Sequence, residues 1–190
     1  SDGLLTEGWH LKGEGRGEKV TLVMFHGNAG HRGHRLPWAM AIRKAFGVGV
    51  VLTDPRGYGG NEGMPDEEGL YRDAEACLQW TKEVVGGKIV LYGESIGSGV
   101  AVELARRMNE RGSPVSGVIL QAAFSSLVDV AMGTYPFLFP NYLLKDRYHN
   151  LDKIDKIGAP LLVVHGTRDE IVPFEHGRRL FQMAKSPKMM

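Results

Sequence analysis

Residues 88–99 read K-I-V-L-Y-G-E-S-I-G-S-G. The apolar first half predicts a buried strand, and the small residues that follow predict a sharp turn into a helix. Residues 93–97 therefore form a G-x-S-x-G pattern at a strand-to-helix junction, a turn that strains the serine backbone and leaves no room for side chains at Gly93 and Gly97. The pattern predicts a nucleophile elbow that lifts the Ser95 hydroxyl above the sheet edge. Gly99 is expected to let the following helix approach the sheet.

Similar apolar runs alternate with helical patterns along the rest of the chain. Continuous apolar runs are typical of strands buried on both faces of a parallel sheet, and we expect them at 19–25, 48–53, 88–92, 118–121 and 161–165. Residues 4–11 alternate better and are expected to form an antiparallel edge strand. Helical spacing and charged end turns predict helices over 36–46, 66–85, 95–111 and 174–184. This order predicts an α/β fold, with one domain over residues 1–190.

The composition excludes several classes of protein. Of the 190 residues, 43 % are hydrophobic and 24 % are charged, which is typical of a globular domain and not of a disordered or collagen-like chain. A net charge of +1 argues against a nucleic-acid-binding protein, which normally has a basic excess. The single cysteine, Cys77, excludes an internal disulfide and a cysteine-based zinc site. No run reaches the ~20 apolar residues of a membrane span and residues 1–3 begin no signal peptide, so the cellular location and an anchor outside this chain stay open.

Two further motifs follow strands of the predicted sheet. H-G-N-A-G at 26–30 comes directly after the strand 19–25, where ester-hydrolysing α/β enzymes place a loop that supplies one amide of an oxyanion hole. The amides of Asn28 and Ile96 are the two donors predicted by this arrangement. The motif L-L-V-V-H-G-T-R-D-E at 161–170 places Asp169 just after a late strand. Its position downstream of Ser95 fits the order serine, acid, histidine, in which the acid orients the imidazole base.

The glycines of residues 93–99 also fit the Gly-rich turn with which short-chain dehydrogenases bind a dinucleotide. Three features oppose this oxidoreductase alternative. Such a turn should follow the first strand, the next strand ends in L-Q-A without an acidic residue for a ribose, and the chain has no Tyr-x-x-x-Lys pair. A non-catalytic scaffold that binds a ligand is a second alternative that the sequence leaves open.

Together, the motifs resemble the α/β-hydrolase superfamily, in the branch of ABHD-type serine hydrolases that includes palmitoyl-protein thioesterases and lysophospholipase-like enzymes. The matching pieces follow the family's order over nearly the whole chain: H-G-N-A-G (26–30), G-H-R-L-P (33–37), D-P-R-G-Y-G (54–59), N-E-G (61–63), E-E-G-L-Y (67–71), G-E-S-I-G-S-G (93–99) and H-G-T-R-D-E-I-V-P (165–173).

The resemblance implies an α/β-hydrolase fold, with a mostly parallel central sheet flanked by helices and a short lid after the strand that the family counts as its sixth. It implies that Ser95 is the nucleophile, Asp169 is the acid, and Asn28 and Ile96 supply the oxyanion amides. The implied reaction is hydrolysis of an ester or thioester through an acyl-enzyme on Ser95, with no metal and no organic cofactor.

One departure from the family concerns the base, which normally lies on a loop after one more strand. Only His176 follows Asp169 here, in a P-F-E-H-G-R-R-L pattern that predicts a helix, so we expect it on a helical surface. We therefore expect the catalytic histidine, with the family's last strand and helix, to lie beyond Met190. Asp54 and Arg56, in the D-P-R-G-Y-G loop, are expected to be structural rather than catalytic.

Residues 133–150 form the candidate lid. They include five of the chain's 16 aromatic residues, and Pro136 and Pro140 prevent one regular helix. We expect an apolar cap over Ser95 in which Phe137 and Phe139 contact an acyl chain, although packing on the sheet would explain the same residues. The predicted partner is a small-molecule or lipid acyl substrate, with peripheral membrane contact as a further option and no nucleic acid. The oligomeric state is not predicted.

Overall fold

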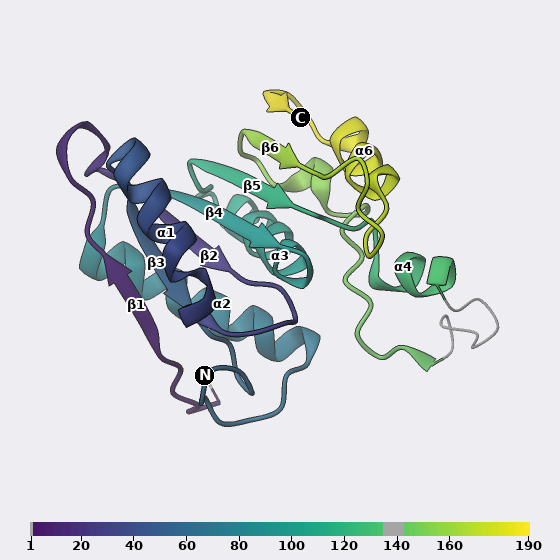
Figure 1. Cartoon of the computed structure of the whole chain (residues 1–190), viewed down its shortest axis with the longest axis horizontal. Coiled ribbons are helices and arrows are strands. Elements are labelled where there is room, and N and C mark those ends of the chain that lie inside the picture. Colours follow the sequence, from purple (N-terminus) through teal and green to yellow (C-terminus); the bar gives the residue numbers. More distant parts are fainter. Residues whose placement is uncertain (1, 135–142) are drawn as a thin grey trace.

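A computed structural model describes residues 2–134 and 143–190 (Figure 1). Its centre is a seven-stranded sheet in the order β1-β3-β2-β4-β5-β6-β7. β1 runs antiparallel to β3, and the other neighbouring strands pair in parallel. The strands are β1 (Gly8–Leu11), β2 (Val20–Phe25), β3 (Gly49–Thr53), β4 (Lys88–Glu94), β5 (Gly117–Gln121), β6 (Leu161–Val164) and β7 (Lys188–Met189).

Helices cover both faces of this sheet (Figure 1). They are α1 (Arg32–Phe46), α2 (Glu67–Trp80), α3 (Ile96–Glu110), α4 (Leu127–Thr134) and α6 (Phe174–Met183). Successive side chains of a strand point to opposite faces. In β2, Met24 accordingly packs in a cluster with Ala39 of α1, whereas Val23 packs in a larger cluster with Leu78 of α2 and Leu104 of α3. None of the helices in the described ranges combines the length and apolar character that crossing a bilayer requires.

The predicted fold class is confirmed, and the elements differ from their predictions mainly at their ends. The edge strand expected over 4–11 is shorter, because only Gly8–Leu11 pairs with β3. α1 begins at Arg32 rather than at residue 36, because the His31 side chain caps it by accepting a hydrogen bond from Gly33 N–H at 3.1 Å. Two elements were not predicted, α4 and β7. β7 pairs in parallel with β6, so a strand that we expected beyond Met190 already begins within the chain.

A charged cluster fixes α3, the helix that begins just after Ser95. Glu103 of α3 is only 3 % exposed and accepts hydrogen bonds from Arg106 and Arg107, while Lys153 Nζ lies 3.1 Å from its Oε2. Burial opposes ionisation, but these three cations outweigh it and lower the pKa of Glu103 to about 2. The carboxylate therefore stays ionised and holds α3 against the segment of Lys153.

The parallel strands bring the sequence motifs to one edge of the sheet. The loop 26–30 follows β2, Ser95 follows β4, and the loop with Asp169 follows β6. Parallel strands end at the same edge, and β2, β4, β5 and β6 are consecutive neighbours in the sheet. The carboxyl edge of these strands is therefore where a shared site can form.

Candidate active site

Ser95 occupies the turn between β4 and α3. Its backbone has φ of 51° and ψ of −117°, and its N–H donates to the Gln121 carbonyl at 2.9 Å. Such a conformation costs a residue other than glycine about 1–3 kcal/mol and persists only where the surroundings impose it. The side chain is partly exposed, and its Oγ makes no hydrogen bond to any residue in the described ranges. Ser95 thus has the strained backbone and accessible hydroxyl expected of a nucleophile elbow.

Glycines make this turn sterically possible. A Cβ on Gly97 would lie 2.1 Å from the Phe25 carbonyl oxygen, and a Cβ on Gly93 would lie 2.5 Å from the carbonyl oxygen of Gly97. The steric prediction for these two glycines is therefore confirmed. The prediction for Gly99 is wrong, because a Cβ there would meet the ring of Tyr148 at 2.5 Å rather than the sheet.

The loop after β2 lies directly beside Ser95. A Cβ on Gly27 would be 3.3 Å from Ser95 Cβ, so this loop and the elbow are in contact. Asn28 follows Gly27, and Ile96 is the first residue of α3, where main-chain amides have no partner within the helix. Neither amide donates a hydrogen bond within the part of the chain that the structure describes. Both predicted oxyanion donors lie on the two segments that meet at the serine, and both are unengaged.

Asp169 lies in the loop after β6. Its Oδ1 accepts hydrogen bonds from the N–H groups of Ile171 at 3.0 Å and Val172 at 2.9 Å, which fix the carboxylate. Its Oδ2 lies 3.8 Å from His165 Nε2, but that nitrogen is 2.7 Å from the Val172 carbonyl oxygen and donates there. β6 is two positions from β4 in the sheet, so the strands that precede Asp169 and Ser95 are about 10 Å apart. An imidazole between them would have to bridge that gap.

None of the chain's own histidines bridges it. All seven lie in the described ranges, and no ring nitrogen hydrogen-bonds Ser95 Oγ. His26 and His165 lie at the carboxyl edge of the sheet, where Ser95 is. One ring nitrogen of His26 is hydrogen-bonded to the Gly27 carbonyl, and one of His165 is hydrogen-bonded to the Val172 carbonyl. The structure therefore brings together the predicted nucleophile and oxyanion loop, places the acid loop at the same edge of the sheet, and positions none of the described histidines as a base.

His176 is in a different environment from the one predicted. It was expected on a helical surface, but it is partly buried on α6, with Nδ1 2.9 Å from Ser125 Oγ. That hydroxyl also donates to Asp129 Oδ2 at 2.5 Å. Burial lowers the pKa of His176. This cluster could not be predicted from the sequence, because Asp129 belongs to α4, which was not predicted.

A comparison with known families identifies the fold. The family description "alpha/beta hydrolase fold" matches residues 20–152, more than half of the chain. The chain belongs to the α/β-hydrolase family. The resemblance drawn from its motifs is thereby confirmed.

Curated relatives of this α/β hydrolase are longer than the 190-residue chain. An uncharacterised protein of Mycobacterium tuberculosis is 37 % identical over 98 % of this chain and 66 % of its own length. The lysophosphatidylserine lipase ABHD12 of Danio rerio is 32 % identical over 96 % of this chain and 51 % of its own length. Human alpha/beta hydrolase domain-containing protein 17B is 34 % identical over 89 % of this chain and 57 % of its own length. The chain spans about half to two-thirds of the length of such relatives.

Solved structures share the α/β-hydrolase fold at lower identity. A monoacylglycerol lipase from Paleococcus ferrophilus matches with a TM-score of 0.70 and 20 % identity over 97 % of this chain and 87 % of its own. A soluble variant of monoglyceride lipase from Saccharomyces cerevisiae matches with a TM-score of 0.77 and 15 % identity over 99 % of this chain and 82 % of its own. At these identities the likeness concerns the fold.

Asp54 and Arg56 of the D-P-R-G-Y-G loop brace neighbouring segments. The fully buried Asp54 carboxylate accepts hydrogen bonds from the main-chain N–H and the side chain of Arg32, at 2.6 Å and 2.5 Å. The Arg56 side chain donates to Asp73 of α2 at 2.7 Å. These contacts fit the structural role that the resemblance implies. Tyr58 of the same loop was not singled out from the sequence, although its hydroxyl donates to Asn28 Oδ1 at 2.5 Å.

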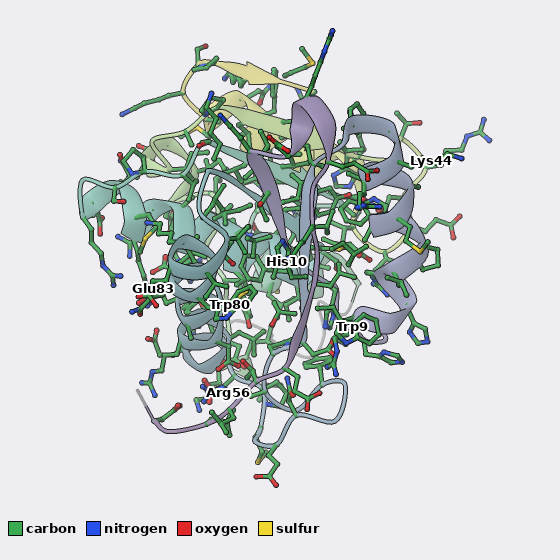
Figure 2. The ribbon with its side chains drawn as sticks, turned by 90° about the vertical axis from the view of Figure 1, so that its left-hand side faces the viewer. Trp9, His10, Lys44, Arg56, Trp80 and Glu83 are labelled. Carbon is green, nitrogen blue, oxygen red and sulfur yellow. The ribbon has the colours of Figure 1, made fainter. Side chains whose placement is uncertain are left out.

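The predicted acyl-binding residues Phe137 and Phe139 lie outside the described residues. Two hollows occur elsewhere in the described part of the chain. One of about 400 Å³ lies between the residues before β1 and α2, near Trp80, and one of about 450 Å³ lies near Pro160. Figure 2 looks onto the β1 edge near the first hollow, where His10 faces Trp80 with ring centroids 6.1 Å apart. Ser95 lines neither hollow, so an acyl pocket over the serine stays a prediction.

Proposed function

We propose that this chain is the core of a serine hydrolase that cleaves a carboxylic ester or thioester of acyl or lipid type. The observation that carries the proposal is the arrangement at Ser95. This partly exposed serine has a strained backbone, and its Cβ lies against Gly27 of the loop after β2. The free amides of Asn28 and Ile96 lie on the two segments that meet there. A binding scaffold would have no need for a strained serine beside two unengaged amides.

The proposed reaction proceeds through an acyl-enzyme. An imidazole base takes the proton from Ser95 Oγ, the oxygen bonds to the substrate carbonyl carbon, and the amides of Asn28 and Ile96 bind the resulting oxyanion. The tetrahedral intermediate collapses, and the leaving alcohol or thiol takes the proton back from the imidazolium. Water, activated by the same imidazole, then attacks the acyl-enzyme carbonyl, and collapse of the second tetrahedral intermediate releases the carboxylic acid product and restores the Ser95 hydroxyl. Asp169 orients the imidazole and stabilises its cation through the carboxylate oxygen that the main-chain amides leave open.

Relatives support the acyl or lipid class. One is a lysophosphatidylserine lipase, and two structural neighbours are a monoacylglycerol lipase and a monoglyceride lipase. These activities belong to those proteins. We extend only their common chemistry, hydrolysis of an acyl ester, to this chain.

A fluorophosphonate probe tests the proposal, because it phosphonylates an activated serine. The protein, expressed at the length that its gene encodes, should take up the label, and Ser95→Ala should lose it. Ser98→Ala is the matched control, since Ser98 is a buried serine three residues further along, in α3, whose hydroxyl has no partner in the described ranges. A labelled Ser95→Ala protein would rule out the elbow assignment, and an unlabelled wild type would favour the non-catalytic scaffold.

The lid prediction is tested by comparing ester substrates whose acyl chains differ in length. In our proposal Phe137 and Phe139 contact the acyl chain, and the exposed Leu143 and Met132 on either side touch a lipid surface. Replacing both phenylalanines by serine should lower kcat/KM for a long-chain ester by about 10-fold or more, through lost apolar burial, with acetyl-ester turnover within about 2-fold. Replacing Leu143 and Met132 by serine should make the protein sediment less with phosphatidylcholine vesicles. Equal losses on both esters would instead indicate packing on the sheet.

A further inference from the structure

His26 is a buried histidine, only 5 % exposed, that the proposed reaction does not use. Its Nδ1 lies 2.7 Å from the carbonyl oxygen of Gly27, the next residue along the chain. A carbonyl oxygen can only accept, so Nδ1 is the nitrogen that carries the proton in this contact. Its Nε2 lies 2.9 Å from Asp54 Oδ1, off the line of a straight hydrogen bond. The ring therefore lies between the loop after β2, to which it is hydrogen-bonded, and the loop after β3.

The hydrogen bond from His26 to the Gly27 carbonyl also fixes the orientation of the Asn28 N–H. A trans peptide is planar, and its carbonyl oxygen and the following N–H point in opposite directions. A hydrogen bond that holds the Gly27 oxygen toward His26 therefore also fixes the direction of the Asn28 N–H. Gly27 is the residue that contacts Ser95, so this peptide lies next to the nucleophile.

Tyr58 holds the other end of the same peptide. Its hydroxyl donates to Asn28 Oδ1 at 2.5 Å, and its ring meets the ring of His26 edge-on, with centroids 5.4 Å apart. Tyr58 comes from the same loop as Asp54, and Asp54 is anchored in turn by Arg32 at the start of α1. Tyr58 of the loop after β3 thus contacts the side chains on either side of the Gly27–Asn28 peptide, those of His26 and Asn28.

We infer that His26 is a positioning residue, which orients the Asn28 amide as an oxyanion donor through its hydrogen bond to the Gly27 carbonyl, and that Tyr58 supports it through its contacts to the His26 ring and to Asn28 Oδ1. This inference rests on the proposed function, because it gives the Asn28 amide a task only if Ser95 forms a tetrahedral intermediate. It assigns a role to the first histidine of H-G-N-A-G and to the D-P-R-G-Y-G loop together.

The test compares two substitutions at His26. In His26→Asn the side-chain amide nitrogen can take the place of Nδ1 and donate to the Gly27 oxygen, whereas His26→Leu has similar bulk and no donor. The readouts, measured on the protein at the length that its gene encodes, are kcat, KM and the inhibition constant of an alkyl boronic acid, which forms a tetrahedral adduct on the serine. We expect His26→Leu to lower kcat and boronate affinity by about 100-fold, the size of a lost oxyanion donor, with KM within about 3-fold. His26→Asn should retain both within about 5-fold.

Several outcomes would overturn the inference. Equal losses in the Asn and Leu variants, a change confined to KM, or unchanged boronate affinity in His26→Leu would each show that the donor does not act through the oxyanion. If His26→Leu does not fold, Tyr58→Phe replaces it, since it removes one hydroxyl from a partly exposed residue. It should weaken boronate binding by about 3-fold or more, and no change would count against the inference. Ser95→Ala separates the two claims, because boronate binding that survives it overturns the proposed function itself.

Discussion

Residues 1–190 on their own are expected to hydrolyse a simple ester about 10⁶-fold more slowly than an intact serine hydrolase, the loss typical of a triad without its base. The expectation follows from the positions of all seven histidines. His26 and His165 have a ring nitrogen engaged with the main chain, His176 contacts Ser125, and none hydrogen-bonds Ser95 Oγ. Ser95 therefore has the strained turn and the oxyanion amides but no positioned proton acceptor.

Turnover of p-nitrophenyl butyrate by the 190-residue chain measures this effect. Free imidazole in the buffer should raise the rate of the wild type and leave Ser95→Ala unchanged, because in our proposal the base is the part of the site that none of the seven histidines supplies. Turnover close to that of intact family members, without added imidazole, would contradict the expectation and would mean that one of the seven histidines moves to Ser95. His176 is then the residue to replace first, since it alone follows Asp169 in the chain.

The parts of the site that follow strands could be predicted from the sequence, and the reason is physical. A strand buried on both faces must be almost continuously apolar, so the ends of β2, β4 and β6 are visible as the points where polar and glycine residues begin. Parallel strands end at one edge, so motifs that follow them must meet there. The steric need for Gly93 and Gly97 is equally local, because a tight turn excludes a Cβ whatever surrounds it.

Contacts between distant segments could not be predicted in the same way. The hydrogen bond from Tyr58 to Asn28 joins two loops 30 residues apart, and nothing in either loop specifies the other's side-chain direction. His176 has the amphipathic pattern of a surface helix, but the fold places Ser125 and then Asp129 of α4 beside it. The order of strands in the sheet, which sets these neighbours, is a property of the whole fold rather than of any one segment.

Gly97→Ala should destabilise the protein by about 3 kcal/mol or more, because the added methyl group would overlap main-chain atoms. Its Cβ would lie 2.1 Å from the Phe25 carbonyl oxygen and 2.6 Å from the Phe25 carbonyl carbon. Both are main-chain atoms at the end of β2, so no side chain can move aside and relieve the overlap. α3 would have to shift away from the sheet, and the turn that holds Ser95 would shift with it.

Gly133→Ala is the matched control, because Gly133 is also helical but has nothing within 4 Å of its added Cβ. An alanine there should stabilise the protein by about 0.5–1 kcal/mol, through its higher helix propensity. Urea unfolding measures both variants, and their difference isolates the steric overlap from the general gain of replacing glycine in a helix. If Gly97→Ala unfolds at the same urea concentration as Gly133→Ala, the elbow is not in close contact with β2. The strain at Ser95 would then have no structural cause, because it is the close approach of α3 to the end of β2 that leaves the serine no relaxed conformation.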